Sequence, residues 1–233
     1  MPTSIAHPNP ADPDTVRDVN LLLLSLGISA LPRFLAEHAG AEPTAVRLGY
    51  LDDASLPYAG QHFAVTEFDL LTDAGYVPRR ITARDVDSVE AFDAILGELD
   101  ALYVCGGETF FLLHALRGTD DAPRGLDVVL ADRVRTGLPY IGLSAGSVLA
   151  GSSIEPISGL DDPTLAPGLT NLRGLGLVDT AVVPHADGIL PNYPLELIDR
   201  VRTDYGDRFD LTFVNDDQAL LVSGSGVSVV PSP

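Results

Sequence analysis

The stretch "GLPYIGLSAGSVLAGSS", residues 137–153, decides how this chain is expected to fold. Residues 139–143 have the composition of a short buried strand, and the small residues after Ser144 are typical of a tight turn into a helix. Gly142 and Gly146 flank the serine at two-residue spacing and complete the pattern G-x-S-x-G. A serine on such a sharp turn needs small neighbours, because bulky ones would clash. We interpret the stretch as a nucleophile elbow rather than as a purely structural turn.

Apolar runs and helical patterns alternate on both sides of this stretch. The expected strands lie at residues 19–27, 45–55, 77–82, 100–107 and 139–143. The expected helices lie at residues 30–40, 58–76, 88–99, 109–118 and 126–137. This alternation predicts an α/β fold with a doubly wound, mostly parallel sheet. Near the C-terminus, residues 211–224 and 226–230 resemble antiparallel strands that close one edge of the sheet.

Composition limits the classes of protein that the chain can belong to. Its 233 residues suit one domain, expected at 19–233, after a loose, proline-containing leader at 1–18 without the features of a signal peptide. No apolar run approaches the roughly 20 residues of a membrane helix. The net charge is −19 and all 14 basic residues are arginine, so nucleic acid is a poor partner. The single cysteine, Cys105, excludes an internal disulfide and fits a cytoplasmic location.

A nucleophilic serine needs a base, and His185 is the best of the five histidines. In "AVVPHADG" it directly follows an apolar strand, whereas the others lie in the leader or in helical patterns. The base in turn needs an orienting carboxylate. We expect this to be Asp161 or Asp162 in the loop "SGLDDP". Three residues further along the chain are weaker alternatives: Asp187, Asp216 and Asp217.

A second glycine-containing turn, "YVCGGETF", follows the strand expected at 100–107. Ligands of doubly wound sheets bind beyond the carboxyl ends of the strands, so this turn and Ser144 should face one crevice. We expect the backbone N–H groups of Gly107 and Ala145 to form an oxyanion hole. The residues expected to contact the substrate are Gly106, Glu108 and Thr109. The alternative is a simple strand-to-helix turn in which Thr109 caps the helix.

Four stretches, "NLLLLS", "VCGGETFFLLHAL", "YIGLSAGS" and "VVPH", occur in an order and spacing that resemble peptidase E. This aspartyl dipeptidase family of serine peptidases also contains cyanophycinase. The resemblance covers the chain from about residue 19 and implies a flavodoxin-like fold akin to class I glutamine amidotransferase domains. It also implies cleavage after an N-terminal aspartyl residue by a Ser-His-Asp/Glu triad. We expect no metal or cofactor, because no His/Cys/Asp cluster has the spacing of metal ligands and such a triad needs none. By that match Ser144 is the nucleophile, His185 the base and Asp161 or Asp162 the acid, with Gly107 in the oxyanion hole.

Two departures from the family pattern bear on specificity. Glu108 stands where these peptidases have asparagine, and its carboxylate is expected to bind a substrate's α-amino group or to repel an aspartyl side chain. No arginine lies between His185 and Arg200 to hold a substrate aspartate. The expected partner is a small peptide substrate. The protein is expected to be a monomer or a homodimer. The alternatives are a non-catalytic, amidotransferase-like binding domain and a cyanophycinase-like hydrolase.

Overall fold

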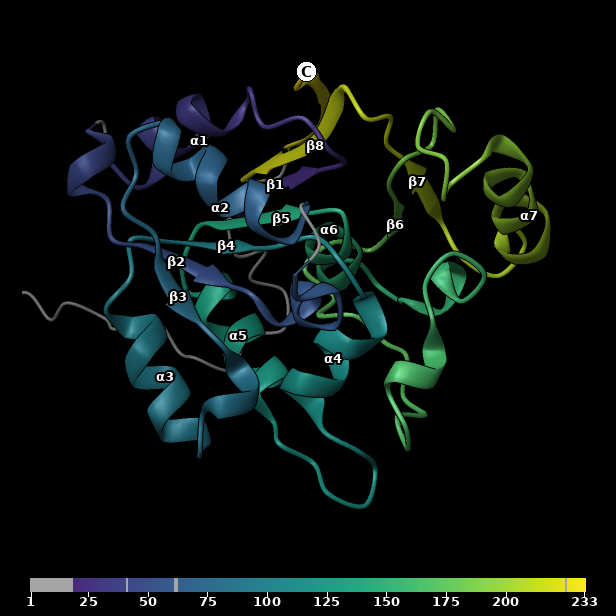
Figure 1. Ribbon diagram of the computed structural model, residues 1–233, viewed down its shortest axis with the longest axis horizontal. Helices are drawn as coiled ribbons and strands as arrows, with labels where there is room; N and C mark the ends of the chain where they lie inside the picture. Colours follow the sequence, from purple (N-terminus) through teal and green to yellow (C-terminus); the bar gives the residue numbers. More distant parts are fainter. Residues whose placement is uncertain (1–18, 41, 61–62, 225) are drawn as a thin grey trace, which may run out of the picture.

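The computed structural model describes residues 19–40, 42–60, 63–224 and 226–233, so the leader expected at 1–18 lies outside the described residues. A seven-stranded sheet with the order β3-β2-β4-β5-β1-β8-β9 forms the centre of the fold (Figure 1). Its parallel strands are β1 (Asn20–Leu24), β2 (Leu48–Leu51), β3 (Arg79–Ile81), β4 (Ala101–Val104) and β5 (Tyr140–Leu143). Two antiparallel strands, β8 (Gln218–Ser223) and β9 (Gly226–Pro231), complete one edge. The predicted mostly parallel α/β sheet is confirmed.

Helices cover both faces of this sheet (Figure 1). On one side lie α1 (Leu31–His38) and α2 (Phe63–Asp73). On the other lie α3 (Val89–Gly97), α4 (Thr109–Arg117) and α5 (Leu126–Arg135), and the short α6 (Ala145–Ala150) follows β5. Helix α2 begins five residues later than expected, and a 3₁₀ helix at Asp53–Tyr58 precedes it.

The central strands are buried throughout, which explains their unbroken apolar composition. Every residue of β2, β4 and β5 is buried, as are four of the five residues of β1. A parallel strand with helices on both faces has no solvent-facing side, so both sets of alternating side chains are apolar. Each fully buried leucine contributes about 1.5–3 kcal/mol relative to an exposed one. This rigid core fixes where the strands end, and therefore where the loops beyond them begin.

A separate two-stranded parallel sheet lies beside the central one. The sequence did not predict this second sheet, so part of the expected topology is wrong. The second sheet consists of β6 (Ala181–Val183) and β7 (Leu211–Phe213), with α7 (Leu195–Tyr205) between them in sequence (Figure 1). The single strand expected at 211–224 is wrong: the stretch forms β7, a turn at 214–217, and then β8 in the central sheet. The chain thus crosses between the two sheets at this turn.

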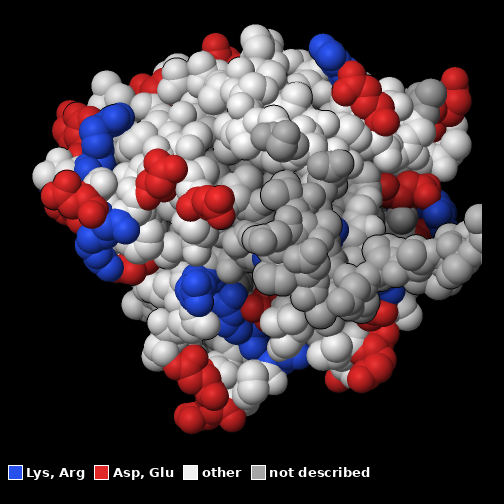
Figure 2. Space-filling view, turned by 180° about the vertical axis from the view of Figure 1, so that it is seen from behind, with Lys and Arg blue, Asp and Glu red and all other residues white. Residues whose placement is uncertain are grey.

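Several exposed basic groups lie next to acidic ones, although acidic residues outnumber basic ones 33 to 14. On the face shown in Figure 2, red carboxylate and blue arginine groups lie at several separate places around the margin. Exposed ion pairs include Arg47–Asp100, Arg79–Glu98 and Arg133–Asp93. Such exposed pairs typically contribute only about 0–1 kcal/mol each. Within the described ranges, no helix is long and apolar enough to cross a membrane.

Candidate active site

Ser144 occupies a strained turn between β5 and α6. Its backbone has φ 47° and ψ −106°, in a region that residues with a Cβ atom rarely adopt. Among the described non-glycine residues, only Ser144 and His185 have positive φ values. Strain of this kind costs about 1–3 kcal/mol per residue and is concentrated at functional sites. The conformation agrees with the nucleophile elbow that the G-x-S-x-G pattern predicts.

The two glycines of the pattern allow close backbone packing around the elbow. A Cβ atom on Gly142 would lie 2.5 Å from the carbonyl carbon of Gly146. A Cβ atom on Gly146 would overlap the carbonyl oxygen of Val104 at the end of β4. The Ser144 N–H also donates to the Leu24 carbonyl over 3.0 Å, which ties the elbow to β1. Neither glycine can gain a side chain without moving a neighbouring strand or helix.

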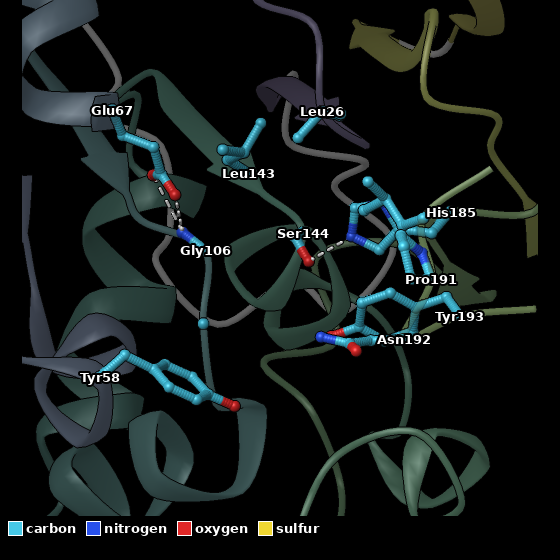
Figure 3. Close-up of a pocket in the computed structure, with 12 residues that line it drawn as sticks. Leu26, Tyr58, Glu67, Gly106, Leu143, Ser144, His185, Pro191, Asn192 and Tyr193 are labelled. Carbon is cyan, nitrogen blue, oxygen red and sulfur yellow. Dashed lines mark hydrogen bonds between the residues drawn. The ribbon is translucent and has the colours of Figure 1, made fainter. Parts of the chain in front are cut away.

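A continuous hydrogen-bonded chain joins a hydroxyl, an imidazole and a carboxylate. Ser144 Oγ lies 2.9 Å from His185 Nε2 (Figure 3). On the other side of the ring, His185 Nδ1 lies 2.6 Å from Asp216 Oδ1. The His185 and Asp216 side chains are only 4% and 10% exposed. The 2.6 Å contact is short, as expected when one partner carries charge. In this geometry Asp216 accepts from Nδ1–H, which leaves Nε2 free to accept the serine proton.

Three further contacts fix the position of the His185 ring. The His185 backbone N–H donates to Ser25 Oγ over 2.7 Å, and that hydroxyl donates to Asp216 Oδ1 over 3.1 Å. Ser25 is completely buried directly after β1. The Tyr193 ring stacks on the imidazole with centroids 4.6 Å apart. The imidazole therefore has a defined orientation, although it lies on a loop.

The expectation that Asp161 or Asp162 is the carboxylate beside His185 is wrong in this structure, because Asp216 takes that place. Asp161 instead accepts the Thr109 N–H at 3.0 Å and the Tyr193 hydroxyl at 3.3 Å. Asp162 accepts from the Thr164 N–H and hydroxyl at the start of a 3₁₀ helix. Both carboxylates are therefore engaged elsewhere.

Asp161 still belongs to the framework around the site. Burial is the main cause that raises the pKa of its carboxyl group to about 6, with the nearby Glu108 adding to the effect. Its contact with the Tyr193 hydroxyl supports the ring that stacks on His185. The loop predicted to complete the triad thus holds the base in place indirectly, from behind Tyr193.

The glycine turn after β4 faces the same crevice as Ser144, as the sheet topology predicts. Gly106 and Gly107 line the cavity that also contains Ser144 and His185. The Gly106 N–H donates to both carboxylate oxygens of Glu67, at 3.2 and 3.1 Å. Gly107 lines the cavity and Ala145 directly follows Ser144. Among the described residues, no backbone carbonyl accepts the N–H group of Gly107 or Ala145.

Glu108 and Thr109 do not reach the cavity, contrary to the expectation that they contact the substrate. Glu108 is only 5% exposed; its Oε1 accepts from the Tyr58 hydroxyl at 2.7 Å and its Oε2 from the Asp162 N–H at 3.2 Å. Thr109 is fully buried at the start of α4. Glu108 therefore lies behind Tyr58, which itself lines the cavity.

The cavity encloses about 340 Å³ and is mostly apolar. Figure 3 shows Glu67, Gly106 and Tyr58 on one side and His185, Pro191 and Tyr193 on the other, with Ser144 between them. The described lining residues are Leu26, Tyr58, Glu67, Gly106, Gly107, Leu143, Ser144, His185, Leu190, Pro191, Asn192 and Tyr193. Cys105 lies outside this lining, and burial raises the pKa of its thiol, which disfavours the thiolate.

A serine at a strained elbow, hydrogen-bonded to a buried imidazole, is the arrangement of serine hydrolases and peptidases. Comparison with known proteins gives the family: residues 30–230 match the model of peptidase family S51, and the chain belongs to this family. The recognised resemblance to peptidase E is thereby confirmed, and the chain is a peptidase by family.

Individual relatives and solved structures agree with this assignment. An uncharacterized peptidase of Listeria monocytogenes is 30% identical over 70% of this chain and 79% of its own length. A peptidase E of Streptomyces coelicolor is 37% identical over 72% of this chain and 64% of its own length. A crystal structure of a candidate peptidase E from Listeria monocytogenes matches 92% of this chain and 98% of its own, with a TM-score of 0.76 and 25% identity.

One further relative matches a smaller share of both chains. An uncharacterized peptidase of Listeria innocua is 34% identical over 58% of this chain, and the match spans 61% of its own length.

Proposed function

We propose that this chain is a serine peptidase that hydrolyses small peptides through a triad of Ser144, His185 and Asp216. The observation that carries the proposal is the continuous chain from Ser144 Oγ through His185 to Asp216, with distances of 2.9 and 2.6 Å. A non-catalytic binding domain has no need to hold a strained serine against a buried imidazole. This geometry favours the enzyme over the binding-domain alternative.

In the first half-reaction, Ser144 Oγ attacks the carbonyl carbon of the scissile bond while His185 Nε2 takes its proton. Negative charge then develops on the carbonyl oxygen, and the N–H groups of Gly107 and Ala145 are the proposed donors to it. His185 returns the proton to the leaving amine as the C–N bond breaks, which leaves an acyl group on Ser144. Asp216 stabilises the imidazolium ion that forms in this step.

In the second half-reaction, water attacks the acyl carbon as His185 removes one of its protons. The bond between the acyl carbon and Ser144 Oγ then breaks, and the serine regains its proton from His185. The carboxylic acid product and the free enzyme result. The described residues that take part in both halves are the same three side chains and the two backbone donors.

The size of the cavity favours dipeptides or similarly short substrates. A volume of about 340 Å³ is at the lower end of the usual range for small-molecule sites, roughly 300–1,000 Å³. Cleavage after an N-terminal aspartyl residue, which the resemblance to peptidase E implies, is the finer form of this proposal. However, the described lining contains no arginine to pair with an aspartyl side chain. Asp-X dipeptides are therefore tested as one substrate class among several, and the proposal does not require that they are cleaved.

A panel of free dipeptides tests the proposed function. Purified protein is incubated with Ala-X, Leu-X, Glu-X and Asp-X dipeptides and with an aspartate–arginine polymer, and released amino acids are quantified. We expect turnover of at least one dipeptide class. Absence of turnover across the panel contradicts the proposal, and cleavage of the polymer alone favours the cyanophycinase-like alternative.

A further inference from the structure

Glu67 is a carboxylate within the candidate active site that the proposed reaction does not use. It extends from α2 toward the turn after β4 and lines the cavity on the side opposite His185 (Figure 3). Its described contacts are the two hydrogen bonds from the Gly106 N–H and one of 3.5 Å from the Tyr103 hydroxyl. All of these donors are uncharged. The carboxylate has no basic partner among the residues that the structure describes.

Glu67 is half-buried, and a carboxylate that is partly removed from water and has no basic partner is costly to ionise. Burial raises the pKa of Glu67 to about 7, and the hydrogen bonds from Gly106 and Tyr103 only partly oppose that rise. A cation supplied by a ligand would provide the missing charge partner. The question is then which cationic group of a peptide reaches Glu67 when the scissile bond lies at Ser144.

The position of Gly106 answers this question. A Cβ atom placed on Gly106 would lie 2.9 Å from Glu67 Oε1 and 3.4 Å from Ser144 Cβ. The carboxylate and the nucleophile are thus separated by little more than the width of one small group. In a peptide, two covalent bonds of about 1.5 Å each join the carbonyl carbon of the N-terminal residue to its α-amino nitrogen. The α-ammonium group is therefore the cation that fits this distance, whereas the charge on a lysine or arginine side chain lies further from the carbonyl.

We propose that Glu67 binds the α-ammonium group of the substrate's N-terminal residue and that this residue has an uncharged side chain. The inference rests on the proposed function, because it places the scissile carbonyl at Ser144. Leu143 and Leu26 line the cavity between the Glu67 side and the His185 side (Figure 3), and they suit an apolar side chain. An aspartyl side chain would instead place a second negative charge near Glu67, with no arginine in the described lining to offset it.

The test compares the wild type with Glu67→Gln on a matched pair of substrates. Leucine p-nitroanilide carries the α-ammonium group, and its des-amino analogue lacks only that group. Glutamine keeps an oxygen to accept the Gly106 N–H but removes the charge. We expect KM for leucine p-nitroanilide to rise about 10- to 100-fold, as for loss of a hydrogen bond between charged groups. We expect KM for the des-amino analogue to change less than threefold.

Glu98→Gln is the control, because Glu98 is an exposed carboxylate paired with Arg79 away from the cavity. It should leave the preference for the free amine unchanged. A second comparison uses aspartyl p-nitroanilide. The kcat/KM of the wild type should be at least tenfold higher for the leucyl than for the aspartyl substrate, and Glu67→Gln should reduce this ratio.

The pH dependence gives a readout that a merely structural role would not produce. Ionised Glu67 binds the ammonium group and protonated Glu67 does not. The ratio of kcat/KM between wild type and Glu67→Gln on leucine p-nitroanilide should therefore rise as the pH increases from about 5.5 to 7.5. Taking the ratio removes the titration of groups that both proteins share.

Two results would overturn the inference. One is an equal loss on the free and des-amino substrates, which would mean that Glu67 only holds the Gly106 turn. The other is a wild-type preference for aspartyl or lysyl p-nitroanilide over the leucyl substrate. Either result leaves the proposed function standing if the wild type still hydrolyses peptides, so the two failures are distinguishable.

Discussion

Replacing Ser144 with alanine is expected to lower kcat by about 10⁴–10⁶-fold, because loss of a triad nucleophile typically costs that much. The fold should persist, since the change deletes one hydroxyl at the edge of a cavity and leaves the contacts of Gly142 and Gly146 intact. Activity is measured on the best dipeptide of the panel, and folding is followed by thermal denaturation.

Ser153→Ala is the matched control for this variant. Ser153 is buried and its hydroxyl donates to the Leu172 carbonyl over 3.1 Å, outside the described cavity lining. We expect a modest loss of stability and activity within threefold of the wild type. A Ser144→Ala protein that retains more than a tenth of wild-type activity would show that the elbow serine is not the nucleophile.

The second large effect is expected for Asp216→Asn, with a fall in kcat of about 10⁴-fold, as found when the corresponding residue of a serine protease triad is changed in this way. An asparagine amide can donate to His185 Nδ1, which places the imidazole proton on Nε2. The base then cannot accept the proton of Ser144. The variant keeps the shape of the side chain, so near-normal thermal stability distinguishes the loss of catalysis from unfolding.

Asp162→Asn serves as the control for Asp216→Asn, since Asp162 is a carboxylate that caps a 3₁₀ helix and does not contact His185. Its activity should remain within threefold of the wild type. Asp161→Asn should lie between the two, because Asp161 supports His185 only through Tyr193. A larger loss of kcat in the Asp161 variant than in the Asp216 variant would show that Asp161, in the loop that the sequence favoured, is the triad carboxylate.

The parts of the structure that local sequence predicts are those fixed by short-range rules. Apolar strands alternating with helical patterns predict the parallel sheet, and G-x-S-x-G predicts the strained turn at Ser144. The Ser88 hydroxyl accepts the Ala91 N–H at the start of α3, which is the capping contact that a serine before a helix typically makes. His185 follows an apolar strand and lies next to Ser144, as the sequence indicates.

Asp216 was only a weak candidate, because its position depends on a crossing between two sheets. Residues 211–224 have the composition of one continuous strand, yet β7 pairs with β6 and β8 pairs with β1. The turn between them carries Asp216 to His185, which is 31 residues away in sequence. The available signal was the run "LTFV" before "NDD": an apolar strand followed by polar residues, as in "AVVPH" before His185.

No pattern in the sequence indicates that Glu67 belongs to the site. It lies within a helix, where a single glutamate ordinarily faces solvent. Its carboxylate reaches the site only because α2 packs beside the carboxyl end of β4, where the Gly106 N–H donates to it. The sequence does not indicate a role for Ser25 either, because Ser25 and its partner Asp216 are 191 residues apart in the chain. Long-range contacts of this kind follow from packing of the whole chain rather than from any local pattern.

Covalent labelling with a fluorophosphonate tests the central claim most directly, because the reagent phosphonylates a serine only when a neighbouring base activates its hydroxyl. The wild-type protein is treated with the probe, digested and analysed by mass spectrometry to locate the adduct. We predict one adduct on Ser144, absent from Ser144→Ala and formed far more slowly by Asp216→Asn. An adduct on another residue, or hydrolysis of dipeptides by a protein that the probe does not label at Ser144, would contradict the account.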